Sequence, residues 1–176
     1  MKTVHYKIPV SQRFLSGHPR AGQNTYFAEK IQLALSDLNG PVMMYADDMT
    51  IVDELKFHTI RNNFELWNKR IHKVSIGKAV IDLCYWKLPG GRFTPGNDLI
   101  TFVTFDKDSG CGVQKIILKE DLVCASIETS YSYNLIVSTS IIADNDGLSH
   151  EDFKAWFKGY DLSEPMAIIH FTSFRY

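Results

Sequence analysis

A short segment of the chain concentrates side chains that could bind an anion or transfer a proton. Lys56, His58, Thr59 and Arg61 lie within six residues and supply two cations, an imidazole and a hydroxyl. An extended backbone would direct Lys56 and His58 to one side and Thr59 and Arg61 to the other. If a helix begins near residue 62, its free N–H groups and the two cations would together favour a phosphate. The alternative interpretation is an amphipathic edge strand whose cations face water.

The standard motifs of nucleotide, metal and hydrolase chemistry are missing from the sequence. It contains no GxxxxGK[ST] phosphate loop, GxGxxG turn, HExxH helix or GxSxG elbow. Residues 144–147 read DNDG and begin like a calcium loop, but the later acidic ligands of such a loop are missing. We therefore interpret residues 144–147 as a turn and predict neither a metal nor a cofactor.

Apolar spacing predicts helices in the first half of the chain and mainly strands in the second. The first helix is expected over residues 25–38, capped by Asn24 and stopped by the sequence NGP at 39–41. A second helix is expected over 62–73, and a late helix opens at Ser149. Strands are expected at 79–86, 99–105, 113–118, 133–139 and 167–174, with a hairpin loop at 106–112 and a long loop of open role at 89–97. This order predicts an α+β fold with a strongly bent or closed sheet.

Composition limits the classes of function. The 176 residues are 45% hydrophobic and 22% charged, with a net charge of −1, which argues against a polybasic protein that coats nucleic acid. Residues 1–74 hold ten Lys/Arg and seven Asp/Glu, so a cationic site is expected in the first half. The three cysteines form no CxxC, and no apolar run is long enough to span a membrane. We expect a cytoplasmic protein with no membrane partner, and the sequence does not predict its oligomeric state.

Several stretches together resemble the ASCH domain family of the PUA-like superfamily. Lys56, Thr59 and Arg61 match the K-x-x-T-x-R version of a signature commonly written GxKxxExR. Residues 18–31 read HPRAGQNTYFAEKI, which is similar to a stretch in ASCH-like proteins of Bacteroidetes and their phages. The likeness continues at residues 58–67, 147–157 and 168–176, whereas residues 86–92 depart from the W-x-G-K-P-Y-R of those relatives.

The resemblance implies a fold, a ligand class and a set of site residues. ASCH domains have a partly closed β-barrel of about five or six mixed strands with flanking helices, here one domain over 1–176 with an N-terminal helical extension in about 1–50. They are proposed to bind RNA or nucleotides in a cleft between barrel and helices. The ligand-binding residues would be Lys56, His58, Thr59, Arg61, Arg20 and Arg92. Aromatic side chains that could stack on a base are Trp86, Phe93, Tyr131 and Tyr133.

Two alternatives to simple binding follow from the same resemblance. Some ASCH proteins are similar to enzymes, namely an amidohydrolase of a modified nucleoside and ribonucleases. In that case Lys56 would act as a base for the hydroxyl of Thr59 or for water, and a carboxylate would pass a proton to the leaving amine. The candidate carboxylates are Asp144 and Asp146, and we select Asp146. The other alternative is a protein-interaction role, in which side chains such as Phe93 would fill the cleft.

Overall fold

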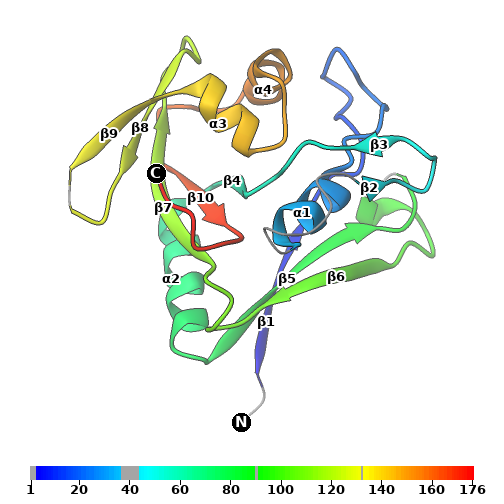
Figure 1. Ribbon diagram of the computed structural model, residues 1–176, viewed down its shortest axis with the longest axis horizontal. Helices are drawn as coiled ribbons and strands as arrows, with labels where there is room; N and C mark the ends of the chain where they lie inside the picture. The colour runs from blue at the N-terminus through cyan, green and yellow to red at the C-terminus, as the bar shows by residue number, and fades with distance from the viewer. Residues whose placement is uncertain (1–2, 37–43, 90, 132) are drawn as a thin grey trace.

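The computed structural model describes residues 3–36, 44–89, 91–131 and 133–176, which form an α+β architecture (Figure 1). The larger sheet is antiparallel, in the order β4 (His58–Asn62), β10 (Met166–His170), β7 (Gly112–Leu118), β8 (Cys124–Glu128) and β9 (Asn134–Ser138). The smaller sheet has the order β1 (Val4–Pro9), β5 (Ala79–Trp86) and β6 (Leu99–Phe105). A separate short pair consists of β2 (Met44–Tyr45) and β3 (Ile51–Val52).

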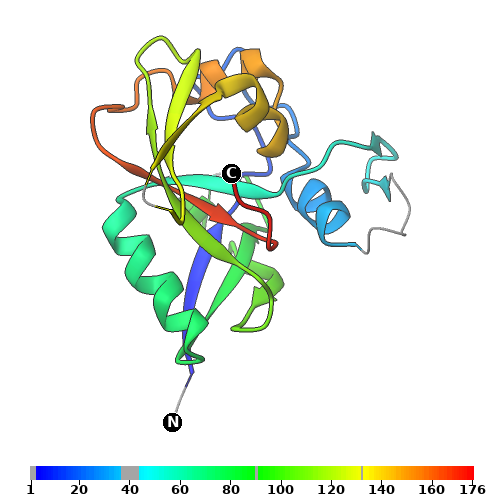
Figure 2. The ribbon, with the colours of Figure 1, turned by 60° about the vertical axis from the view of Figure 1, so that its left-hand side comes forward.

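The helices of the described chain fill the space around the two sheets. They are α1 (Phe27–Leu35), α2 (Phe64–Ser75), α3 (Thr139–Asn145) and α4 (His150–Phe157), with a 3-10 turn at Gly91–Phe93. Helix α2 packs against strands of both sheets, and α3 and α4 pack on one another at one end of the molecule (Figures 1 and 2). The side chain of Asn63 caps α2 by accepting a hydrogen bond from the N–H of Leu66, 3.0 Å away.

One hydrophobic cluster joins the two sheets and the helices. It includes Ile8 and Leu83 from the smaller sheet, Ile168 from the larger sheet, and Ile142 and Phe153 from α3 and α4. All of these side chains are fully buried. Because the sheets share this core, strand β4 and the turn after α3 are held against the same packed interior.

The α+β class is confirmed. The described strands form the two main sheets and the short β2–β3 pair but no closed barrel, and the partly closed barrel stays a prediction. The hairpin predicted at 106–112 is wrong, because β6 pairs with β5 while β7 pairs with β10 and β8. Residues 106–112 therefore cross from one sheet to the other. A polar loop between two apolar segments shows that the chain turns, but it does not show that the two strands pair.

Most predicted elements are confirmed with small changes of boundary. Strands β5 and β6 have the predicted bounds, and Ser149 caps α4 through the N–H of Asp152. Helix α1 begins later than expected, at Phe27, and its N-cap residue is Tyr26 rather than Asn24. The side-chain amide of Asn24 donates a hydrogen bond to Asp48 instead. The expected end of this helix, at residues 37–41, lies outside the described residues. Strands β1 and β8 and helix α3 were not predicted.

Within the described ranges, every helix is too short or too polar to cross a membrane.

Candidate functional site

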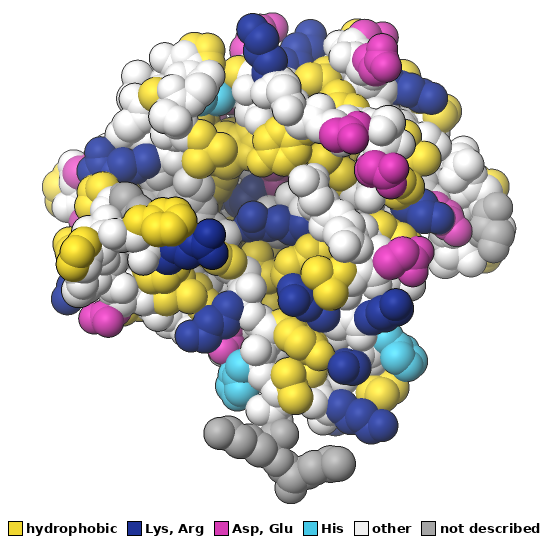
Figure 3. All heavy atoms as spheres, turned by 180° about the vertical axis from the view of Figure 1, so that it is seen from behind, with side chains coloured by type: hydrophobic (Ala, Val, Ile, Leu, Met, Phe, Trp, Pro, Cys, Tyr) yellow, Lys and Arg dark blue, Asp and Glu magenta, His cyan; other side chains and the backbone are white. Residues whose placement is uncertain are grey.

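The residues of the 56–61 segment meet the predicted carboxylate at one cavity. Lys56, Thr59, Arg61 and Asp146 all line a hollow of about 250 Å³ between the end of β1, strand β4 and helix α4. Its other walls are largely apolar and aromatic, formed by Pro9, Val10, Leu15, Phe27, Ile60, Trp156, Phe157 and Tyr160. Figure 3, which shows the molecule from behind, has a hollow near its centre with Lys or Arg side chains inside it and hydrophobic side chains around it.

Lys56 does not follow the alternation expected of an extended segment. Strand β4 begins only at His58, so Lys56 precedes the strand and can line the same cavity as Thr59. Its backbone N–H instead donates to the carbonyl of Lys30 in α1, at 3.2 Å. The expectation that Lys56 and Thr59 face opposite sides is therefore wrong, because it required a regular strand from residue 56 onward.

Lys56 and Asp146 form a buried ion pair at the bottom of the cavity. The Lys56 Nζ donates to Asp146 Oδ1 at 2.5 Å and to the Asp146 carbonyl at 2.7 Å, and it lies 4.1 Å from the centre of the Phe27 ring. Burial lowers the pKa of Lys56 to about 8, although the carboxylate opposes that shift. Burial alone would raise the pKa of Asp146, but the charge of Lys56 and the contact with His58 outweigh it, so the pKa is lowered. The carboxylate is therefore held ionised.

The turn after α3 is built to bring Asp146 to Lys56. Gly147 has a φ of +67°, and a Cβ there would lie 3.1 Å from the Lys56 Cβ and from the Lys30 Cδ. Lys30, which is buried in α1, donates to the carbonyl of Gly147 at 2.8 Å and also pairs with Glu54. Two lysines thus bind successive carbonyls of this turn. The predicted turn at 144–147 is confirmed at Asp146 and Gly147 and is wrong at residues 144 and 145, which belong to α3. The Asp146 carboxylate binds the ammonium group of Lys56.

His58 lies behind Asp146 rather than on the cavity wall. Its Nδ1 is 3.4 Å from Asp146 Oδ1, and its Nε2 is 2.8 Å from the hydroxyl of Tyr176. That hydroxyl also accepts a hydrogen bond from the Asn145 side chain, at 3.0 Å. Burial lowers the pKa of His58, so the ring is neutral. Tyr176 then donates to Nε2, whereas Nδ1 lies near the carboxylate without a hydrogen bond in the described chain.

Arg61 lines the cavity with donors to spare. Its Nη2 donates to the carbonyl of Pro9 at 2.6 Å, while its Nε is buried without a partner in the described part of the chain. Burial lowers the pKa of Arg61, and Asp146 and Tyr160 oppose that shift. The hydroxyl of Thr59 likewise makes no hydrogen bond to a described residue, although the side chain is buried. Both residues can therefore donate to a ligand.

Arg20 and Arg92 lie outside this cavity. Arg20 donates to Asp152 at 2.6 Å and covers the ring of Phe14, and it lines a neighbouring depression of about 290 Å³. Arg92 belongs to the 3-10 turn in the 89–97 loop and lies over the ring of Phe93. The cationic site predicted in the first half of the chain therefore contains Lys56 and Arg61 but not Arg20, which pairs with Asp152.

The aromatic residues predicted to stack on a base are likewise elsewhere. Phe93, Tyr131 and Tyr133 are exposed, and Tyr131 and Tyr133 stack on each other. The cavity is lined instead by Phe27, Trp156 and Tyr160, which sequence reasoning did not assign to a ligand. Trp156 lies in α4 with the buried Phe153 and Phe157, and apolar spacing along a helix does not separate a core position from a cavity wall.

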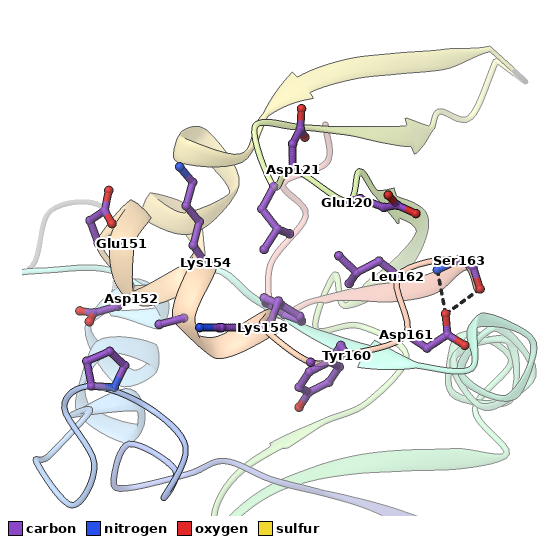
Figure 4. A pocket seen from close by; sticks show the side chains of 15 residues that line it. Glu120, Asp121, Glu151, Asp152, Lys154, Lys158, Tyr160, Asp161, Leu162 and Ser163 are labelled. Carbon is purple, nitrogen blue, oxygen red and sulfur yellow. Dashed lines mark hydrogen bonds between the residues drawn. The ribbon is translucent and has the colours of Figure 1, made fainter.

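A larger cavity of the described chain is lined mainly by acidic side chains. It has a volume of about 740 Å³ and lies between α4 and the segment before β8 (Figure 4). Carboxylates outnumber cations among its lining residues, which include Glu120, Asp121, Glu151, Asp152, Asp161, Lys154 and Lys158. An anion is therefore disfavoured there, and we place the candidate site at the smaller cavity. No group of three or more metal-ligating side chains occurs within the described ranges.

In comparisons with known proteins, no family model, curated protein or solved structure matches the chain.

Proposed function

We propose that the cavity around Lys56 binds one nucleotide, either free or as part of an RNA, and that the chain is a cytoplasmic ASCH-like domain with a PUA-like fold. The observation that carries this proposal is the convergence of Lys56, Thr59 and Arg61 on one cavity with aromatic walls. A volume of about 250 Å³ is small beside the roughly 300–1,000 Å³ of drug-sized pockets. It suits a single base or nucleoside, and a longer strand would have to run outside it.

Each wall has a part in this recognition. The Arg61 guanidinium and the Thr59 hydroxyl donate to a phosphate or to a carbonyl of the base. Trp156 and Tyr160 offer faces on which a base can stack, as in recognition of single-stranded RNA. Such a site needs few charges, which agrees with a chain whose net charge is only −1.

Binding is tested by titrating the protein with nucleoside monophosphates and with a short single-stranded RNA. We expect Arg61→Ala to weaken binding about tenfold or more, since a charged hydrogen bond contributes roughly 1.5–3 kcal/mol. The matched control is Arg92→Ala, which removes an equally charged side chain outside the cavity and should leave the affinity unchanged. Affinity should also fall with added salt if a phosphate is bound. Wild-type protein that binds none of these ligands, or equal losses in the two variants, would contradict the proposal.

A second candidate function, hydrolysis of an acylated nucleoside or of RNA, is favoured by the state of Lys56. With a pKa of about 8, a substantial fraction of Lys56 is neutral near that pH. For an acylated base, Lys56 would take the Thr59 proton as the hydroxyl oxygen attacks the acyl carbon. The C–N bond would then break, the ammonium of Lys56 would return the proton to the leaving amine, and water would release the acyl group from Thr59. Because Asp146 is held ionised, we propose that it positions the Lys56 ammonium group. It would not pass a proton to the leaving amine, which is the role that the resemblance implies for the carboxylate.

This reaction is tested with acetylated cytidine and with labelled RNA. Turnover should rise as the pH passes through about 8, and Thr59→Val should abolish it while preserving the shape of the side chain. Turnover that persists in Thr59→Val would remove this mechanism. If wild-type protein binds nucleotides without turning over either substrate, the chain is a binding module.

A further inference from the structure

The two sheets end in four edge strands, and they differ in how well they are protected from pairing. Strand β4 is largely buried, and β1 carries His5, Lys7 and Pro9. Charged side chains and Pro are common devices that block the pairing of an edge with another chain. Strands β6 and β9 contain neither, so these two edges are the ones open to a further strand.

Strand β9 lies at the outer edge of the larger sheet (Figure 1), within a stretch of sequence that has no charged residues. From residue 129 to residue 143 the sequence contains no charged side chain. Within it, Ile136 is 61% exposed and Tyr133 is 56% exposed. An uncharged edge strand with exposed apolar side chains is a template for strand addition.

The hydrogen bonds around β9 show which backbone groups point outward. The N–H of Thr129 donates to the carbonyl of Tyr133, and the N–H of Thr139 donates to the carbonyl of Val123. Hydrogen-bonded and non-hydrogen-bonded pairs alternate in an antiparallel ladder, so the odd-numbered residues of β9 bond to β8. The N–H and C=O groups of Asn134, Ile136 and Ser138 therefore point away from the sheet, where the described chain offers no strand to receive them.

We propose that β9 pairs antiparallel with β9 of a second copy of this chain, about a twofold axis at Ile136. Ile136 would then face Ile136 of the second copy, and Asn134 would face Ser138 of the second copy. Each of these pairs would exchange both backbone hydrogen bonds, so all outward groups of the strand are satisfied. The two five-stranded sheets would become one continuous sheet across the dimer. The cavity around Lys56 would stay open, because none of its lining residues belongs to β9.

A second copy of the chain is a better partner for β9 than a charged peptide is. Self-pairing is also more favourable at β9 than at β6. The neutral stretch around β9 offers no charge for a partner to match, whereas an identical neutral strand meets no repulsion. The same symmetric pairing of β6 about Phe102 would set Asp98 opposite Asp106 of the second copy. Like charges directly opposite each other destabilise a strand pair.

The proposal is tested by measuring the mass of the whole chain in solution over a series of concentrations. We expect the mass to rise toward twice 20.1 kDa, with self-association on the order of micromolar. Ile136→Pro removes an outward N–H that donates nothing to β8, and Ile136→Lys adds a charge at the axis, so both should give monomers. Ile76→Lys, at a similarly exposed apolar residue after α2, and Ile100→Lys, at an exposed residue of β6, should leave the dimer intact.

The register has its own test by cross-linking under oxidation in a chain carrying Cys111→Ser and Cys124→Ser. Cα atoms of a hydrogen-bonded antiparallel pair are about 5.5 Å apart, which lies within the range of a disulfide. Ile136→Cys should therefore cross-link to itself, whereas Leu135→Cys should not, because it would face residue 137.

Three results would overturn the proposal. The first is wild-type protein that stays monomeric at the highest concentration. The second is a dimer that persists in Ile136→Lys, with an unchanged circular dichroism spectrum. The third is a dimer that Ile100→Lys abolishes, which would place the interface on β6. If Ile136→Pro does not fold, Ile136→Lys decides.

Discussion

Two ion pairs in this molecule have nearly the same length and very different surroundings. Lys56 donates to Asp146 at 2.5 Å, and Arg20 donates to Asp152 at 2.6 Å. The side chain of Lys56 is 2% exposed, whereas that of Arg20 is 46% exposed. A buried ion pair gives up the hydration of both charges, so each partner depends on the other. The Arg20 guanidinium stays hydrated if its partner is removed, although Asp152 is itself only 12% exposed, so the loss of Asp152 should cost less stability than the loss of Asp146.

The largest expected effect comes from removing one partner of the buried pair. Asp146→Ala leaves the Lys56 charge buried and uncompensated, and we expect the free energy of unfolding to fall by about 3–5 kcal/mol. Asp152→Ala is the matched control and should cost about 1 kcal/mol. Denaturant unfolding of the two variants checks the comparison, and equal losses would show that burial does not distinguish the pairs.

A second prediction concerns pH. Burial lowers the pKa of Lys56 from 10.5 to about 8, so between these values the unfolded chain binds a proton that the folded chain has released. The stability of the wild type should therefore rise with pH across this window, relative to Lys56→Met, by about 3 kcal/mol at most. Unfolding curves of both proteins from pH 7 to about pH 10 measure the difference. Parallel curves would mean that Lys56 keeps its ordinary pKa.

The turn that presents Asp146 gives a smaller effect. Ala at Gly147 would be strained by the positive φ and would press against the Cβ of Lys56, so Gly147→Ala should cost about 2–3 kcal/mol. Gly96 has a φ of +70° with open space around it, so Gly96→Ala isolates the strain and should cost about 1 kcal/mol. Thermal unfolding of the two variants separates the cost of the steric contact with Lys56 from the cost of the positive φ. Equal losses of stability would show that the Lys56 side chain shifts without cost to accept the added Cβ.

The smallest expected change in stability concerns His170, a buried polar residue without a hydrogen-bond partner in the described chain. Both ring nitrogens of His170 are buried with no hydrogen-bond partner in the described chain, and burial holds its pKa far below the ordinary value. Replacing such a group with an apolar one of similar size removes a desolvation penalty. His170→Leu should therefore leave stability unchanged or raise it by about 1 kcal/mol, as measured by denaturant unfolding. A clear loss of stability would reveal a bond of His170 that the static geometry does not show.

Elements with local signals were predictable from the sequence. The spacing of Trp67 and Ile71 indicated α2, and both side chains are buried as that helix requires. The apolar run of β5 and the capping Ser149 are equally local. Helix α3 and strand β8 were missed because their sequences are short and lack a clear period. Pairing was less predictable than the strands themselves, since β6 and β7 are neighbours in the chain but lie in different sheets.

The candidate site was predictable in its residue types and less so in its arrangement. The sequence indicated Lys56, Thr59, Arg61 and a carboxylate near residue 146, and these four line one cavity. It did not indicate that His58 lies behind Asp146, nor that Lys30 and Tyr176 support the site. Those contacts join segments up to 118 residues apart, and no local pattern records them.

The sequence by itself determined the α+β composition, the near-neutral charge and the cluster of cations around residue 56, because these follow from residue types and short-range spacing. Only the tertiary structure decided which cations are buried. Lys56 is shielded from water because α1, β4 and the turn after α3 pack around it, whereas Arg20 is half-exposed at the surface. The dielectric surroundings of a side chain depend on every segment packed against it, and these surroundings distinguish the buried Lys56 from the half-exposed Arg20.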